Sequence, residues 1–140
     1  MNNIVYTGTI ESAFTGFDEN SVFKMGNGTY WIQAKYEYWY HYAYRPNAEI
    51  TLENGQYVLT VDGHSIPVKR LHNVVESKID GSFEGWDGEK TYKLANGQVW
   101  QQAEYKYQFK YSYCPDVIIY NISGRYIMAV DGTKACVKRM

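Results

Sequence analysis

The stretch Tyr-Glu-Tyr-Trp-Tyr-His-Tyr-Ala-Tyr, at residues 36–44, places a tyrosine at every second position five times in succession. Residues 105–113 repeat the pattern as Tyr-Lys-Tyr-Gln-Phe-Lys-Tyr-Ser-Tyr. A period of two is typical of a β-strand, whose successive side chains point to opposite faces, whereas a helix would spread these rings around its axis. Nine strand residues span roughly 30 Å, which is long for a small domain. We therefore predict one long strand over about residues 30–44 that bends, serves two sheets and carries aromatic rings on one face.

The composition describes a folded chain without a strong overall electric field. Hydrophobic residues make up 45% of the 140 positions and aromatic residues 17%, including 15 tyrosines, which argues against disorder. The 14 basic and 15 acidic residues nearly cancel, so the net charge of -1 does not draw the chain to nucleic acid or to an anionic membrane. No apolar run approaches the ~20 residues of a membrane helix, and residues 1–6 lack the pattern of a secretory signal. We therefore expect a cytoplasmic protein with no membrane partner.

The two tyrosine stretches belong to a tandem duplication. When residues 3–71 are placed over residues 72–140 without a gap, 25 of the 69 pairs are identical. The identical pairs include the four glycine pairs Gly16/Gly85, Gly28/Gly97, Gly55/Gly124 and Gly63/Gly132. A glycine shared by both copies is expected to mark a positive φ or a close approach of two backbones. We predict two domains, residues 1–71 and 72–140, which superpose closely and pack as a pseudo-two-fold dimer because no flexible linker separates them.

Turn signals divide each copy into short strands. In the first copy, Asn27-Gly28, Asn54-Gly55 and Asp62-Gly63 lie between β-rich runs and predict tight hairpins, because these residues accept positive φ. We expect a first strand from about Ile4 to Phe14, followed by a loop at Gly16-Phe17-Asp18 with an aromatic residue at its tip. No segment has a sustained helical period. The predicted fold is therefore all-β, with two tandem SH3-like small barrels of five or six strands each.

Part of the second copy resembles a known type of repeat. Residues 92–102 read Tyr-Lys-Leu-Ala-Asn-Gly-Gln-Val-Trp-Gln-Gln, and residues 137–139 read Val-Lys-Arg. Together with Gly85-Trp86-Asp87 they resemble an uncharacterised family of small bacterial SH3-like repeats, built around an Asn-Gly-Gln-x-Trp-x-Gln core and a closing Val-x-Arg. The likeness covers nearly all of each copy, although Thr29 replaces the family's first Gln in the first copy. It implies an SH3-like all-β fold and a bacterial or phage origin, and it implies no catalytic residues.

The tyrosine ladders have two interpretations. In the first, the rings form the buried face of each strand, because tyrosine has a strong β propensity and aromatic cross-strand pairs stabilise a sheet. In the second, part of each ladder stays exposed as a binding surface, to which tyrosine contributes rigid amphipathic contact area. The candidate ligand-binding residues are Tyr36, Tyr38, Trp39, Tyr40, Tyr42 and Tyr44 in the first copy, and Tyr105, Tyr107, Tyr111 and Tyr113 in the second.

Two other shared pairs precede the ladders. Trp31 and Trp100 read as core anchors beside the Asn-Gly hairpin, with a ligand contact as the alternative. Gln33 and Gln102 read as polar strand positions that satisfy a neighbour, and again the alternative is a ligand contact. We therefore expect structural roles for these four residues, with ligand contacts as the alternative.

The shared basic pairs and the unshared cysteines also have two interpretations. Lys69-Arg70 and Lys138-Arg139 read as a solvated edge strand, where lysine discourages aggregation, or as phosphate contacts. Cys114 and Cys136 have no partner in the other copy and show no metal-ligand spacing. We expect two free thiols in a reducing cytosol, with a disulfide as the alternative.

The sequence favours binding over catalysis. It has no Gly-rich phosphate loop and no nucleophile and base shared by both copies, so we predict no enzyme, no cofactor and no metal site. We expect a binding module that recognises a protein segment or a glycan, by adding a strand at a sheet edge in the first case. The alternatives are a nucleic-acid module that stacks bases on its rings, which the balanced charge disfavours, and a structural subunit of a homo-oligomer. The second copy has nine basic and eight acidic residues, which makes it the expected side for an anionic ligand.

Overall fold

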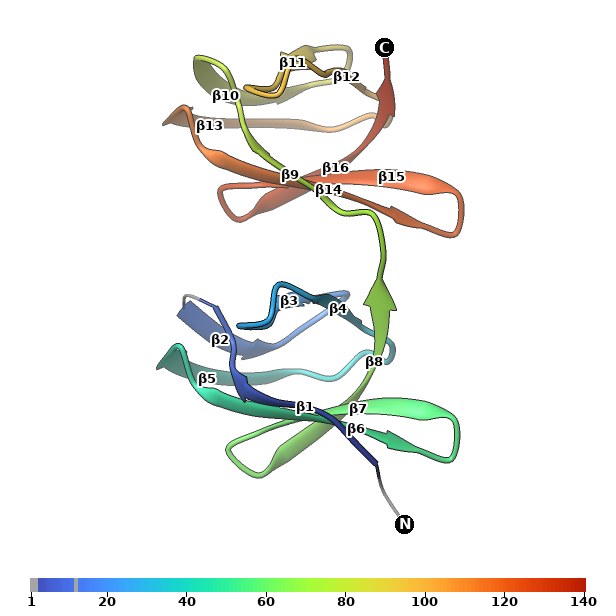
Figure 1. The fold of residues 1–140 in the computed structure, drawn as a ribbon. Helices are drawn as coiled ribbons and strands as arrows, with labels where there is room; N and C mark the ends of the chain where they lie inside the picture. Colours follow the sequence, from blue (N-terminus) through green and yellow to red (C-terminus); the bar gives the residue numbers. More distant parts are fainter. Residues whose placement is uncertain (1–2, 12) are drawn as a thin grey trace. The chain divides into compact units, whose positions relative to one another are not determined.

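The computed structural model describes residues 3–11 and 13–140, and these residues form an all-β protein (Figure 1). The chain divides into two compact units, Met1–Leu71 and His72–Met140. Eight strands and no helix occur among the described residues of each unit. Each unit has two or three strands more than the five or six predicted, and two of these arise because two predicted strands are each broken into two.

Unit 1 contains a six-stranded and a two-stranded antiparallel sheet. In the larger sheet the strands follow the order β1-β6-β7-β8-β4-β3, and in the smaller one β2 pairs with β5. The eight strands are β1 (Asn3–Thr9), β2 (Ala13–Phe17), β3 (Val22–Lys24), β4 (Tyr30–Gln33), β5 (Trp39–Tyr44), β6 (Asn47–Glu53), β7 (Gln56–Val61) and β8 (His64–Leu71).

Unit 2 has the same topology. Its larger sheet follows the order β9-β14-β15-β16-β12-β11, and β10 pairs with β13 in the smaller sheet. The strands are β9 (Val75–Lys78), β10 (Ser82–Asp87), β11 (Thr91–Lys93), β12 (Val99–Gln102), β13 (Tyr107–Tyr113), β14 (Asp116–Ile122), β15 (Arg125–Val130) and β16 (Thr133–Arg139). The first strand of each unit pairs within its own unit, as β1 with β6 and β9 with β14.

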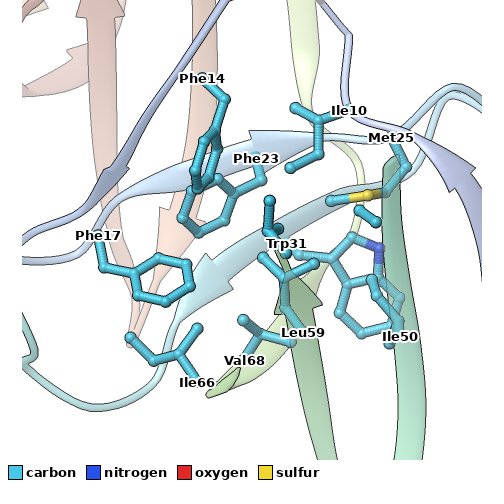
Figure 2. Packing of buried hydrophobic residues seen from close by; sticks show 12 residues of the cluster. Ile10, Phe14, Phe17, Phe23, Met25, Trp31, Ile50, Leu59, Ile66 and Val68 are labelled. Atoms are coloured by element: carbon cyan, nitrogen blue, oxygen red, sulfur yellow. The ribbon is translucent and has the colours of Figure 1, made fainter. Parts of the chain in front are cut away.

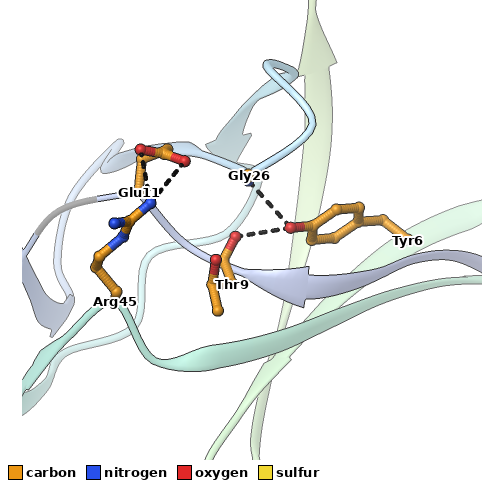
Figure 3. Close-up of polar contacts among 5 residues, drawn as sticks. All are labelled: Tyr6, Thr9, Glu11, Gly26 and Arg45. Carbon is orange, nitrogen blue, oxygen red and sulfur yellow. Dashed lines mark hydrogen bonds and ion pairs between the residues drawn. The ribbon is translucent and has the colours of Figure 1, made fainter.

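The prediction of one first strand is wrong, because the chain turns a corner between β1 and β2. Residue 12 within that predicted strand lies outside the described residues. At the corner the Tyr6 hydroxyl donates to the Thr9 carbonyl at 2.7 Å and accepts from the Gly26 backbone N–H at 3.0 Å (Figure 3). The Arg45 guanidinium lies 3.3 Å from the Glu11 carboxylate on the same corner (Figure 3). These contacts tie the end of β1 to the β3–β4 turn and to the connection between β5 and β6, where the chain passes from the larger sheet to the smaller one.

The prediction of one strand over residues 30–44 is wrong for a similar reason, although the chain does serve two sheets. It leaves the larger sheet after Gln33 and enters the smaller one at Trp39. The buried Gln33 side-chain amide donates to the carbonyls of Lys35 at 3.0 Å and Glu37 at 3.2 Å, which are thereby satisfied outside any ladder. Its Oε1 accepts the Asp18 backbone N–H at 3.1 Å. Gln33 thus satisfies its neighbours, as predicted, and it also fixes the break.

The predicted loop at residues 16–18 is wrong as well. Gly16 and Phe17 lie in β2, and the Phe17 ring is buried. Gly16 has a φ of 104°, and a Cβ built on it would lie 1.8 Å from the Trp39 carbonyl oxygen, where the register between β2 and β5 shifts. Gly85 repeats this in unit 2, with a φ of 97° and a Cβ that would lie 1.9 Å from the carbonyl oxygen of Gln108. The shared glycine therefore marks a close backbone approach at a β-bulge.

The predicted hairpins are confirmed. Residues 27–28 connect β3 to β4, residues 54–55 connect β6 to β7, and residues 62–63 connect β7 to β8. At the second of these turns the φ angles are 51° at Asn54 and 78° at Gly55, so both central residues are left-handed, as a tight hairpin turn requires.

The core of unit 1 lies between its two sheets (Figure 2). Phe14 and Phe17 come from β2 of the smaller sheet, and they pack with Trp31, Leu59 and Ile66 from the larger one. The core of unit 2 is built from the corresponding positions, including Phe83, Trp86, Tyr92 and Trp100. Fully burying one such side chain stabilises the fold by about 1.5–3 kcal/mol. Each unit therefore has a hydrophobic core of its own.

Candidate binding surfaces on the tyrosine ladders

Both tyrosine ladders are exposed. In unit 1 the exposed fraction runs from 59% at Tyr42 to 69% at Tyr44, and in unit 2 it runs from 59% at Tyr111 to 88% at Tyr105. We define ladder 1 as Tyr36, Tyr38, Tyr40, Tyr42 and Tyr44, and ladder 2 as Tyr105, Tyr107, Phe109, Tyr111 and Tyr113. The interpretation of the rings as a buried face is therefore wrong, and the predicted exposure is confirmed, whereas the use of the rings for binding stays a prediction.

Several residues of the neighbouring strand that lie opposite ladder rings are small, although Asp87 lies opposite Tyr107. On β2, Gly16 is paired with Tyr40 and Ala13 with Tyr44. On β10, Gly85 is paired with Phe109, and Ser82 lies opposite Tyr113. None of these four partners is large enough to cover a ring. The rings therefore stand out from the two-stranded sheet on its outer face.

The exposed aromatic area of each ladder is large for a small domain. An aromatic side chain has about 200 Å² of surface, so five rings about two-thirds exposed present on the order of 600 Å². The largest apolar patch on an ordinary monomer covers about 300–600 Å² and is often functional. Each unit therefore presents an aromatic surface of the size that recognition uses.

Each ladder lies beside an open sheet edge. Among the described residues, β5 pairs only with β2, and β13 pairs only with β10. The second edge of each ladder strand therefore has no strand partner, and its backbone N–H and C=O groups are available for pairing. The exposed rings on β5 and β13 therefore lie next to an unpaired strand edge, whereas Tyr36, Tyr38 and Tyr105 precede these strands.

The start of ladder 2 borders a groove of about 680 Å³. Its lining residues include Tyr105 and Tyr107, whose ring centroids lie 5.2 Å apart at an interplanar angle of 65°. Buried Gln102 forms part of the lining, and its Oε1 accepts the backbone N–H groups of Asp87 at 3.0 Å and Gly88 at 2.9 Å. Its amide nitrogen donates to two carbonyls of the following loop, so Gln102 fixes both walls of the groove.

The structure separates one predicted site residue from the rest. Trp39 lies on the inner face of β5, half-buried, with its ring centroid 5.1 Å from that of Phe17 and 3.8 Å from that of His64. The prediction also omitted Phe109, which occupies the position of Tyr40 in ladder 2 and is 79% exposed. The period of two across both copies was the signal that could have found it.

Several other predicted positions have structural roles. Trp31 and Trp100 are buried, and each indole N–H donates to a side chain two residues before it at 3.0 Å. The basic pairs lie on β8 and β16, which are interior strands, so their interpretation as edge-strand residues is wrong. The Arg139 guanidinium lies 6.0 Å from the centroid of the Trp100 ring.

Other kinds of site find no support among the residues that the structure describes. Cys114 and Cys136 are free thiols. Over residues 3–11 and 13–140, no three His, Cys, Asp or Glu side chains are placed to hold a metal ion. The same part of the chain contains no helix that could cross a membrane.

Comparison of the chain with protein-family models, with curated proteins and with solved structures finds no match. The candidate sites are therefore inferred from the geometry of this structure alone.

Proposed function

We propose that the chain is a non-enzymatic binding module in which two SH3-like barrels each present an aromatic ladder and an open strand edge to an extended protein segment. The observation that carries this proposal is the exposure of all ten ladder rings, seven of which lie on β5 or β13 beside an unpaired strand edge. An incoming strand would pair with β5 or β13 and lay its side chains across the rings. The packing of the two units as a pseudo-two-fold pair stays a prediction.

The spacing of the rings favours a polypeptide. Alternate residues on a strand lie about 6.8 Å apart, which is also the spacing of side chains on one face of a bound extended segment. A glycan could stack on the rings, but it has no backbone that repeats the hydrogen-bonding pattern of an open strand edge. Bases stacked on one another repeat at about half the ring spacing, and the carboxylates around the groove would repel phosphates.

A library of linear ten-residue peptides tests the proposal. We expect selected peptides to bind the chain, and their affinity to fall at least tenfold when alternate backbone nitrogens are methylated, because strand addition needs those N–H groups. The matched variants are Tyr40→Thr/Tyr42→Thr/Tyr44→Thr and Phe109→Thr/Tyr111→Thr/Tyr113→Thr, in which threonine keeps a high β propensity. Each triple variant is expected to lose the binding site on its own unit.

Three results would contradict the proposal. If the methylated peptides bind as tightly as the unmethylated ones, strand addition is not the mode of binding. Tight binding of oligo-dT that weakens steeply between 50 and 200 mM salt would favour the nucleic-acid alternative. A dimer in light scattering that either threonine variant dissociates would favour the homo-oligomer alternative.

A further inference from the structure

The groove at the start of ladder 2 combines aromatic rings with carboxylates. Tyr105 and Tyr107 supply two exposed rings that meet at 65°. Asp87, Glu89 and Glu104 also line the groove. Ring faces attract cations through their quadrupole, and a carboxylate close by adds a direct charge interaction.

Two of the carboxylates are held in place by backbone groups. Glu104 Oε1 accepts the Cys136 backbone N–H at 2.7 Å, and Asp87 Oδ1 accepts the Glu89 backbone N–H at 3.1 Å. Each of these bonds engages one oxygen of a carboxylate that has two. The anionic groups are therefore oriented before a ligand arrives, which reduces the entropy lost on binding.

The ammonium groups near the groove are mostly directed elsewhere. Lys106 donates to the carbonyl of Lys134 at 2.7 Å, and Lys90 lies 3.5 Å from the Glu84 carboxylate. Among the lining residues, Lys138 is the single cationic side chain against three carboxylates. The groove is therefore anionic, although the composition of the second copy suggested an anionic ligand.

The equivalent positions of unit 1 lack this combination. Lys35 stands where unit 2 has Glu104, and Asn20 stands where it has Glu89. Glu19 occupies the position of Gly88, on which a Cβ would lie 3.4 Å from the Tyr107 hydroxyl. That distance is an ordinary van der Waals contact, so the feature that distinguishes unit 2 is its charge pattern.

We infer that this groove binds an alkylammonium group, the side chain of a lysine carried by the extended segment that docks on β13. The inference rests on the proposed function for the position of the segment, and it adds the chemistry that selects it. The lysine stem lies against Tyr105 and Tyr107, and its ammonium group faces Glu89 and Glu104. Unit 2 therefore selects basic segments, whereas unit 1 makes no such selection.

The test uses two versions of one library-selected ten-residue peptide. The first has a lysine at the groove position, and the second has norleucine there. We expect the lysine peptide to bind about tenfold more tightly, and added salt to reduce that ratio. The variant Glu89→Asn/Glu104→Gln is expected to abolish the preference, because glutamine can still accept the Cys136 N–H without the charge. Asp116→Asn, which removes an exposed carboxylate on β14 outside the groove lining, is the control and is expected to keep it.

Blocked lysine, N-acetyl-lysine methylamide, separates this inference from the proposed function. If it shifts the NMR signals of Gly88 and Tyr107 in the full chain while no peptide binds, strand docking is wrong and the groove inference stands. If both peptides bind with equal affinity, strand docking stands and the groove inference is overturned. If blocked lysine and both peptides all leave these signals unchanged, both are overturned.

Discussion

The space beneath the two ladders is filled in two different ways. In unit 2 the Trp86 indole N–H donates to the Thr133 hydroxyl at 2.9 Å, and that hydroxyl donates to Gln108 at 2.8 Å. In unit 1 the equivalent residues are Phe17, His64 and Trp39, and they form a cluster of rings: the centroid of His64 stacks 3.8 Å from that of Trp39, and the Phe17 ring is tilted against Trp39 at 5.1 Å. A hydrogen-bonded chain in one copy therefore corresponds to an aromatic cluster in the other.

The difference shows that the residues at these three positions depend on one another. A buried tryptophan N–H needs an acceptor, so Trp86 requires Thr133, whereas Phe17 needs only rings beside it. The backbone around the set is the same in both units because the bulge glycine and the buried glutamine are shared. The shared residues fix the path of the chain, and the exchanged residues only have to satisfy one another.

The largest expected effect is at a shared position. Gly85→Ala should reduce the free energy of unfolding of unit 2 by about 3–5 kcal/mol, because its Cβ would collide with the Gln108 carbonyl oxygen at a positive φ. Gly124→Ala is the control, since it also has a positive φ but nothing within 4 Å, and it should cost about 1–2 kcal/mol. Urea unfolding followed by ¹⁹F NMR of 5-fluorotryptophan resolves the units, because each has two tryptophans. If Gly85→Ala and Gly124→Ala reduce the free energy of unfolding equally, the close approach to Gln108 is not the reason for glycine at position 85.

The second prediction concerns pH and separates the two cores. Burial raises the pKa of Tyr120 to about 12 and raises the pKa of Tyr92 still further, whereas the equivalent residues of unit 1 are Thr51 and Phe23. Above pH 10 the unfolded chain loses these protons and the folded unit keeps them, so unit 2 loses stability as the pH rises from about 10 to 12. Each phenol contributes a slope of about 1.4 kcal/mol per pH unit.

The same fluorine signals measure this slope at pH 9, 10 and 11. Tyr92→Phe should flatten it, although the variant starts from a lower stability because the Tyr92 hydroxyl donates to the Gly85 carbonyl at 2.7 Å. An unchanged slope in Tyr92→Phe/Tyr120→Phe would show that other groups cause the alkaline loss.

The third prediction dissects the set beneath ladder 2. Thr133→Val removes the acceptor of the Trp86 N–H and should cost about 1–3 kcal/mol, whereas in a Trp86→Phe background the same change should cost clearly less. A double-mutant cycle on the unfolding free energy of unit 2 is therefore expected to give a coupling of about 1–2 kcal/mol. Additive effects would mean that the two positions do not act together.

The smallest expected effect on stability is on the ladders. Replacing one exposed ring, as in Tyr42→Thr or Tyr111→Thr, should change the unfolding free energy by less than about 1 kcal/mol, because the lost cross-strand contacts are small. The measurement is again urea unfolding of each unit. A loss above about 2 kcal/mol would assign the ladder a structural role in place of a binding one.

The parts of this fold that the sequence predicted are those fixed by local chemistry. The Asn-Gly and Asp-Gly turns require positive φ within a few residues, so the hairpins could be placed from the sequence. The strand breaks could not, because the break after Gln33 depends on its contact with Asp18, which lies 15 positions earlier in the chain. The corner held by Tyr6 and Gly26 depends in the same way on a contact between distant residues.

The candidate site was also predicted only where it depends on a local sequence pattern. The period of two correctly grouped the rings that lie on β5 and β13, but it also included Tyr36, Tyr38 and Tyr105, which precede these strands, and it left open whether the rings were buried. The groove was missed because it depends on Gly88 and Glu104, which lie beside the ladder in space and differ between the copies. Such differences of charge between two copies of one fold were the available signal.

The bulge at Gly16 and Gly85 has a consequence for self-association. A bulge increases the local twist of the strand pair, and a strongly twisted edge accepts a short partner that can follow the twist. Fibril growth needs the opposite, which is a flat edge on which identical strands stack without limit. A single residue without a side chain thus makes an exposed aromatic edge a poor template for fibril growth.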